Sequence, residues 1–288
     1  MPRPALAPTP RPPPTDVAAL EHHYNGSRAV YDGWSRAGHM HHGYAAFGGP
    51  WTHEGMLDAM VDRVVDDLAL RDDARVADLG CGYGATAARI VRSKPGVSVD
   101  AVTILEEQVA HMEAHPVDGR TPLLADYCDT GLEEDGYDGA FFLESIDYGT
   151  GAGKADAVAE AARLLRPGGR LVVAGPFLTG RPGGPLGALI CAVERAFAIT
   201  CFAETGAFEH ALHHHGFVLE RNELASFHIA PTVVVGHLRA AALIARRAWQ
   251  GRWLSDDESA HLRGGFLGVW LGLCLWAFQY RIYTARRA

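Results

Sequence analysis

The sequence predicts an α/β fold built around a mostly parallel β-sheet. Between residues 75 and 177, short β-branched runs alternate with segments of helical character. A glycine-rich turn, at residues 78–84, separates the first of these runs from the segment that follows it. The chain has 288 residues, of which 48% are hydrophobic, so it can bury a large core. Strict alternation of strand and helix implies right-handed crossovers and therefore parallel strands.

Each element follows from its residue pattern. Short apolar and β-branched runs bounded by turn residues predict strands at 75–79, 97–104, 122–125, 139–143 and 170–174. The segments between them predict helices at 85–92, 108–114 and 155–165. The segment 280–284 predicts a closing strand that runs antiparallel to the others.

These elements divide the chain into four regions. Residues 1–15 are rich in Pro and Ala and predict a disordered tail. Residues 16–70 predict a helical lid region, interrupted by a loop of His, Gly and aromatic residues at 38–51. Residues 71–177 predict the ligand-binding core. Residues 178–288 predict a helical insertion and closing strands, which we expect to cover the substrate.

Composition excludes several classes of function. The formal net charge is −8 and the basic residues are scattered, so no nucleic-acid partner is expected. The five cysteines are odd in number and show no CxxC spacing, which favours a reducing, cytoplasmic location over a disulfide framework. The longest uncharged apolar run, 264–278, is shorter than the ~20 residues that span a bilayer. We therefore expect a buried helix there and no integral membrane span.

The turn at residues 78–84, with the sequence DLGCGYG, is the sharpest functional feature. Its glycines let the backbone turn tightly and approach a ligand without a Cβ in the way. Their spacing also fits a dinucleotide pattern, so an NAD-dependent oxidoreductase is one interpretation. That pattern needs an acid at the end of the second strand, where this sequence has Thr103. Asp126 after the third strand, and the RPGG turn before the fifth, favour a methyl donor instead.

Three motifs together resemble the class I S-adenosylmethionine-dependent methyltransferases: DLGCGYG, LLADY and LLRPGG. The resemblance implies a Rossmann-like sheet of seven mostly parallel strands with helices on both faces. It also implies an N-terminal helical lid and a helical insertion before the last strands. A narrower resemblance rests on the pair Tyr31-Asp32, the HMHHGY loop (39–44), LES (143–145) and FQYRI (278–282). It points to a small-molecule group that includes tocopherol, sterol and prenyl-diphosphate C-methyltransferases and antibiotic sugar O-methyltransferases.

The resemblance implies S-adenosylmethionine as the cofactor and S-adenosylhomocysteine as the product. The glycines would line the methionine part, Asp126 would accept a hydrogen bond from the adenine amino group, and Tyr127 would pack on the ring. Gln108 would lie near the ribose, and Tyr31 would close over the cofactor. Thr103 departs from the acid that many members carry at this position. The cofactor-binding candidates are Tyr31, Asp78, Gly80, Cys81, Gly82, Gly84, Thr103, Gln108, Asp126, Tyr127 and Glu144.

Catalytic candidates follow the fourth strand. The sugar O-methyltransferases carry a His here that can remove a hydroxyl proton, whereas this chain has Asp147 and Tyr148. Because Tyr148 resembles the prenyl members, we predict C-methylation of a small, apolar terpenoid or prenyl-type acceptor. Glu144 would handle the cation or the proton, and Tyr148 and His42 complete the catalytic set. An apolar, cation-tolerant pocket is predicted from four aromatic residues: Tyr44, Trp51, Phe177 and Phe202.

Other functions stay open at this point. The nearest alternative is O- or N-methyl transfer to a secondary metabolite, and another is a binding module that keeps the fold without catalysis. The loop at 39–42 carries three histidines but no obvious fourth ligand, so no metal site is expected. Mg²⁺ would be needed only with a diphosphate substrate. The expected partner is a small molecule, and the sequence leaves open a homo-oligomer.

Overall fold

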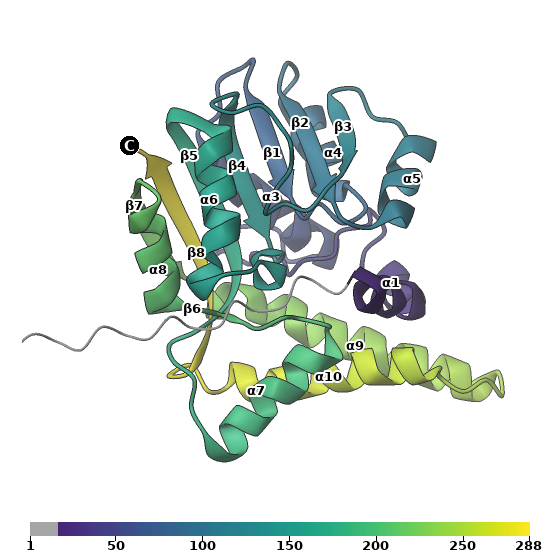
Figure 1. Cartoon of the computed structure of the whole chain (residues 1–288). Helices are drawn as coiled ribbons and strands as arrows, with labels where there is room; N and C mark the ends of the chain where they lie inside the picture. Colours follow the sequence, from purple (N-terminus) through teal and green to yellow (C-terminus); the bar gives the residue numbers. More distant parts are fainter. Residues whose placement is uncertain (1–16) are drawn as a thin grey trace, which may run out of the picture.

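The computed structural model describes residues 17–288, so the predicted tail at 1–15 lies outside the described residues. Within that range, eight strands form one mixed sheet in the order β3-β2-β1-β4-β5-β8-β7, with β6 paired to β5 (Figure 1). The strands are β1 (Arg75–Leu79), β2 (Ser98–Thr103), β3 (Arg120–Leu124), β4 (Tyr137–Leu143), β5 (Leu165–Leu178), β6 (Ala203–Glu204), β7 (Phe217–Leu224) and β8 (Phe278–Arg287). The predicted Rossmann-like class is confirmed, with eight strands where seven were expected.

The strands run in the directions that the sequence predicts. β1 pairs in parallel with β2 and β4, and β5 continues the parallel series beside β4. The closing strand β8 lies antiparallel to β5, in a register that sets Val173 beside Tyr283. The additional strand is β6, which pairs with Phe177 and Leu178 at the carboxyl end of β5. β5 extends to Leu178, beyond the predicted end at residue 174, and this extension provides the edge on which β6 pairs.

Helices cover both faces of the sheet (Figure 1). One face packs on α3 (His53–Leu68) and α4 (Ala85–Ser93), and the other on α6 (Ala155–Leu164) and α8 (Thr205–His214). Because side chains alternate along a strand, β4 supplies both cores. Its Ala140 and Phe142 lie in the α6 side, and Phe141 and Leu143 lie in the α3 side. The central strands are therefore buried on both faces, as parallel strands require.

Most of the remaining helices gather beyond the carboxyl ends of the parallel strands (Figure 1). From the amino-terminal region come α1 (Val17–Gly26) and α2 (Arg28–Trp34), and α5 (Glu106–Ala114) lies beside β3. The carboxyl-terminal region adds α7 (Gly184–Ala196), α9 (Ser226–Trp249) and α10 (Asp256–Gly272). Two short 3₁₀ helices, η1 (Ile146–Tyr148) and η2 (Ala152–Lys154), follow β4. Ligands bind at this end of such sheets, so these helices surround the expected site.

The expectation of a buried helix at 264–278 is wrong. This segment begins inside α10, but Phe266, Trp270 and Trp276 are 45%, 66% and 70% exposed. Apolar composition predicted burial, whereas only part of the helix surface packs on α7. The structure also identifies a different apolar segment. Among residues 17–288, α9 is the one helix long and apolar enough to cross a membrane by length and composition.

Candidate functional site

The β1–α4 turn brings its backbone close to two neighbouring elements. Gly80 and Gly84 have φ values of +92° and +75°, and each packs tightly. A Cβ on Gly80 would come within 2.4 Å of the Ser145 side chain, and one on Gly84 within 2.4 Å of Met112 Sδ. At Gly82, with φ +55°, the nearest atom to such a Cβ is Met40 Sδ at 3.0 Å. The turn is thus fixed on both sides, and its centre faces the lid loop across a cavity.

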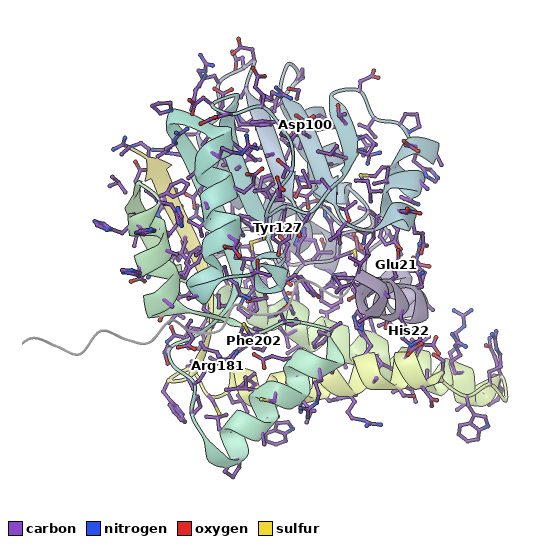
Figure 2. The ribbon with its side chains drawn as sticks, viewed as in Figure 1. Glu21, His22, Asp100, Tyr127, Arg181 and Phe202 are labelled. Atoms are coloured by element: carbon purple, nitrogen blue, oxygen red, sulfur yellow. The ribbon has the colours of Figure 1, made fainter. Side chains whose placement is uncertain are left out.

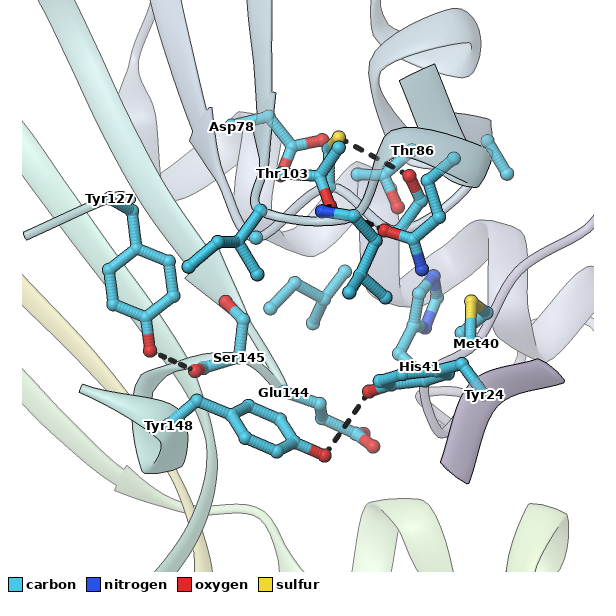
Figure 3. A pocket seen from close by; sticks show the side chains of 18 of the residues that line it. Tyr24, Met40, His41, Asp78, Thr86, Thr103, Tyr127, Glu144, Ser145 and Tyr148 are labelled. Carbon is cyan, nitrogen blue, oxygen red and sulfur yellow. Dashed lines mark hydrogen bonds between the residues drawn. The ribbon is translucent and has the colours of Figure 1, made fainter. Parts of the chain in front are cut away.

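That cavity lies between the carboxyl ends of β1, β2 and β4 and the lid helices (Figure 3). Its sheet side includes Asp78, Thr103 and Tyr127, and its lid side includes Tyr24 and Met40. Apolar walls alternate with polar groups, as in sites that bind small organic cofactors. The wall residues come from segments far apart in the chain, because the parallel strands all end at this edge of the sheet.

Asp78 carries an unusual carboxylate. Its side chain is 2% exposed, and its Oδ2 atom has no hydrogen-bond partner among the described residues. Burial raises the pKa of Asp78 to about 8. A buried carboxylate without a partner is costly, so it indicates a missing cationic or donor group. The cavity beside Asp78 is the place where such a group can bind.

The polar groups opposite are arranged for a ligand with donors and acceptors. Thr103 Oγ1 donates to Gln108 Oε1 at 2.5 Å, and both side chains are buried. This bond occupies the oxygen of the Gln108 amide and leaves its NH₂ group to donate elsewhere. Asp126 Oδ1 accepts from the Cys128 amide at 2.8 Å. The Tyr127 hydroxyl donates to the Ser145 carbonyl at 2.8 Å, which fixes the ring against the cavity.

Glu144, directly after β4, is the most heavily hydrogen-bonded carboxylate at the site. Its Oε1 accepts from the His42 amide at 2.7 Å and from the Tyr280 hydroxyl at 2.8 Å. The His42 ring places Nδ1 3.0 Å from both carboxylate oxygens. Burial alone would raise the pKa of Glu144, but the charge and hydrogen bonds of His42 hold it below its usual value. Burial alone would lower the pKa of His42, but Glu144 raises it above its usual value. The two form an ion pair.

Two tyrosines close the cavity from the lid side. The hydroxyls of Tyr24 on α1 and Tyr148 on η1 are 3.1 Å apart (Figure 3). Tyr148 also donates to the Phe197 carbonyl at the end of α7, at 3.0 Å. The Tyr24 and Tyr31 rings stack at a centroid distance of 5.5 Å. The lid, the core and the carboxyl-terminal insertion therefore meet at one hydroxyl cluster.

The other lid histidines form a neutral buried pair. His39 Nδ1 and His41 Nε2 are 3.1 Å apart, and both side chains are under 5% exposed. Burial lowers the pKa of each ring to about 4. Among residues 17–288, no group of three His, Cys, Asp or Glu side chains is arranged to hold a metal ion.

Comparison with known proteins finds similarity to methyltransferases. Residues 76–169 match the family model described as a methyltransferase domain. The 27-O-demethylrifamycin SV methyltransferase of Amycolatopsis mediterranei is 31% identical over 155 residues, 50% of this chain and 54% of that protein. The O-methyltransferase rstn1 of Aspergillus nomiae is 26% identical over 193 residues, 63% of this chain and 81% of that protein.

The domain match, the methyltransferase relatives and the shared fold together support a class I S-adenosylmethionine-dependent methyltransferase. Solved structures share its whole fold. The mycolic acid cyclopropane synthase CmaA1 aligns with a TM-score of 0.79 at 17% identity, over 96% of this chain and 99% of that one. The [4+2]-cyclase SpnF aligns with a TM-score of 0.73 at 20% identity, over 96% and 97%. The chain spans about half the length of most of the curated relatives it matches.

The methyltransferase fold brings nearly all the predicted cofactor residues together. Ten of them line the cavity: Tyr31, Asp78, Gly80, Cys81, Gly82, Thr103, Gln108, Asp126, Tyr127 and Glu144. Gly84 lies behind the turn against Met112 and does not line it. Of the catalytic candidates, Tyr148 lines the cavity, and His42 lies beside it in contact with Glu144. The roles of these residues stay predictions.

None of the four aromatic residues predicted to form the substrate pocket lines this cavity: Tyr44, Trp51, Phe177 and Phe202. Phe177 is fully buried against Phe208 in the core beside α8. Tyr44 donates its hydroxyl to a carboxylate on β7. Phe202 packs near α7, away from the cavity (Figure 2), and Trp51 is 63% exposed. A sequence gives the type of a side chain but not the direction in which it points.

Other site residues were not among the candidates. Tyr24, Met40, His41 and Ser145 line the cavity, and Tyr280 bonds to Glu144. Tyr280 lies in the FQYRI segment, which predicted the closing strand. Nothing in that segment predicted the hydrogen bond from Tyr280 to Glu144. Tyr24 lies on α1 in a segment without a motif, and only the folded lid reveals it.

Replacing Gly82 by Val tests the centre of the turn. The variant should lose about tenfold or more of its affinity for S-adenosylhomocysteine, ~1.4 kcal/mol, because the side chain enters the cavity opposite Met40. Calorimetry measures this, and NADH should bind to neither protein. Gly131→Val is the matched control, since Gly131 also has positive φ (+67°) but open space around it. Equal affinity in wild type and Gly82→Val would remove the turn from the binding site.

Replacing Asp78 by Asn should stabilise the ligand-free protein while weakening cofactor binding. The pKa of Asp78 is higher in the folded protein than in the unfolded chain. The protonated Asp78 carboxyl therefore contributes to the free energy of unfolding, and this contribution is lost as pH rises from about 4 to about 8. Above that range Asn removes a buried charge, and we expect a gain of roughly 1–3 kcal/mol. Thermal melting as a function of pH measures this. A variant that is less stable than wild type at pH 8, without ligand, would contradict it.

The lid should become more ordered when ligand binds. Tyr24, Tyr31, Met40 and His41 all face the cavity, so a bound molecule adds contacts to them. Lid segments commonly close over a reaction in this way. Hydrogen exchange at residues 31–51 should slow with S-adenosylhomocysteine, whereas β7 at the far edge should not change. Unchanged exchange across 31–51 would contradict a lid.

Proposed function

We propose that this protein methylates a hydroxyl group of a small natural product with S-adenosylmethionine, using His42 as the base. The observation that carries the proposal is the His42–Glu144 pair beside the cavity. Nδ1 of His42 bonds to Glu144, and Nε2 has no hydrogen-bond partner among residues 17–288. A carboxylate that orients a histidine and stabilises its charged form is the usual support for a general base.

The cavity residues fit the cofactor. Asp78, buried with an unpartnered oxygen, would pair with the ammonium of the methionine part. Gln108 would donate its amide to the ribose hydroxyls, and Asp126 and Tyr127 would hold the adenine. The cofactor supplies an electrophilic methyl group bound to a positively charged sulfur. Glu144 lines the cavity as an ionised carboxylate. It would therefore stabilise the positive charge on the cofactor sulfur in addition to the charge on the His42 ring.

His42 would then accept the hydroxyl proton. Its side chain is 35% exposed, so an acceptor can reach the ring. His42 Nε2 would take the hydroxyl proton while the acceptor oxygen receives the methyl group that the cofactor would supply, with S-adenosylhomocysteine as the leaving group. Glu144 stabilises the resulting imidazolium. The positive cofactor nearby would oppose protonation of His42 beforehand, which keeps the ring in its base form at neutral pH.

The printed names of the relatives support an oxygen acceptor. Several are O-methyltransferases, among them rstn1, cnsE and resE. C-methylation of a terpenoid or prenyl-type acceptor is the second candidate. It is favoured by the ionised Glu144 beside the ring cluster of Tyr24, Tyr31 and Tyr148, which suits a carbocation. One geranyl diphosphate methyltransferase structure shares the fold at a TM-score of 0.70 and 19% identity.

Two variants separate these reactions. His42→Asn should lower kcat by ~10²-fold or more with unchanged cofactor affinity if the acceptor is a hydroxyl. Glu144→Gln should keep partial activity and shift the rising limb of the pH profile to lower pH. Glu144 raises the pKa of His42, so removal of the Glu144 charge lowers the pKa of His42 and moves this limb to lower pH. Product mass spectrometry with a labelled methyl donor measures turnover on a panel of hydroxylated and prenylated acceptors.

Three outcomes would contradict the proposal. Full activity in His42→Asn with complete loss in Glu144→Gln would favour C-methylation. If the protein binds the cofactor and converts the acceptor to a product of the same mass, it catalyses a reaction without methyl transfer. One relative is named as an S-adenosyl-L-methionine-dependent Diels-Alderase. Binding of NADH in place of S-adenosylhomocysteine would exclude methylation altogether.

A further inference from the structure

The α9–α10 hairpin, residues 226–278, projects from the body of the protein (Figure 1). Contacts with α1, α2 and α7 hold one side of the hairpin. Gly236 of α9 packs against the Trp34 ring, and Arg239 donates to the Gly33 and Trp34 carbonyls. At the start of α10, Asp257 lies 3.1 Å from His22 of α1, which is labelled in Figure 2. In the most apolar window of α9, 6% of the residues are buried.

The free surface of the hairpin is apolar. Along α9, one helix face carries exposed Val234, Leu238, Ala241, Ala245 and Trp249, at spacings of three and four residues. Val234 and Leu238 are 59% and 67% exposed. Near the carboxyl end, Trp270, Leu273 and Trp276 are 66%, 70% and 70% exposed. Contiguous exposed apolar surface of this kind marks an interaction site.

The tip combines tryptophan with arginine. Trp249 and Trp253 are 92% and 88% exposed, and Arg246 and Arg252 lie exposed beside them. Between residues 226 and 278 there are five arginines and three acidic residues, whereas the whole chain carries a net charge of −8. The hairpin is therefore a basic element on an acidic protein. Tryptophan favours the interface between lipid headgroups and acyl chains, and arginine favours anionic headgroups.

We propose that the α9–α10 hairpin docks the protein on an anionic lipid bilayer, with its tip in the headgroup region. At the tip, Arg247 pairs with Glu258, whereas Arg246 and Arg252 have no acidic partner among residues 17–288 and are available to anionic headgroups. A transmembrane arrangement is disfavoured because Asp256, Asp257 and Glu258 lie at the same tip and would have to cross the membrane. The hairpin thus lies in the interface and does not span it.

Docking there would connect directly to the lid. Thr232 of α9 accepts a hydrogen bond from the Gly43 amide at 3.1 Å. The His228 carbonyl accepts from the Ala45 amide at 2.9 Å, and His228 Nδ1 lies 2.7 Å from the Ala45 oxygen. The lid loop that carries His42 is therefore held by the helix that would contact lipid. The proposal does not depend on which acceptor is methylated.

Vesicle flotation with the full-length protein tests the proposal. At low salt, wild type should float with vesicles of phosphatidylcholine and phosphatidylglycerol, and far less with phosphatidylcholine alone. The double variants Trp249→Ser/Trp253→Ser and Arg246→Glu/Arg252→Glu should each reduce the vesicle partition coefficient by about tenfold or more. Trp51→Ser and Arg92→Glu are matched controls, because both residues are exposed outside the hairpin. Unchanged S-adenosylhomocysteine affinity shows that the variants fold.

Four results would overturn it. The first is failure of wild type to float with either kind of vesicle, and the second is flotation of the hairpin variants at the wild-type level. The third is a concentration-dependent oligomer in light scattering that Trp249→Ser/Trp253→Ser disperses, which would assign the surface to self-association. Resistance of the bound protein to both high salt and alkaline extraction would indicate a spanning segment instead. Quenching of tryptophan fluorescence by brominated lipid, lost in the tryptophan variant, would support interfacial insertion.

Discussion

The site depends on one carboxylate, that of Glu144, and on the strained backbone that presents it. Glu144 has a φ of +56°, which costs a non-glycine residue of order 1–3 kcal/mol, and its amide still donates to the Ala174 carbonyl on β5. The side chain then leaves the sheet and accepts hydrogen bonds from His42 of the lid loop and Tyr280 of β8. The Glu144 carboxylate thus connects the end of β4 with the lid loop and with β8, which lie 102 and 136 positions away in the sequence.

The two buried carboxylates at the strand ends are in opposite electrostatic states. Asp78 has no partner, and burial raises its pKa to about 8, whereas Glu144 is ionised by its pairing with His42. Environments that separate the pKa values of neighbouring carboxyls are typical of sites with divided roles. Here one group is prepared to meet a cationic ligand, and the other already holds a charge next to a titrating ring.

The sequence predicts the part of the site that lies close to strand ends. The DLGCGYG turn, Asp126 and Glu144 each follow a recognisable strand, and parallel topology brings those ends together. Tyr24 and Tyr280 could not be predicted in the same way, because their contacts with Tyr148 and Glu144 cross 124 and 136 positions. The pocket aromatics and the 264–278 helix show a second limit: composition does not reveal which way a side chain faces.

The most direct test of this account is a histidine-ring NMR titration of His42 in the ligand-free protein, assigned with His42→Asn. The account predicts a pKa above the usual value of about 6.5, with Nδ1 held protonated by Glu144, and a fall below the wild-type value in Glu144→Gln. A wild-type pKa below about 6.5, or one that Glu144→Gln leaves unchanged, would show that the two side chains are not paired and would contradict the central role of Glu144.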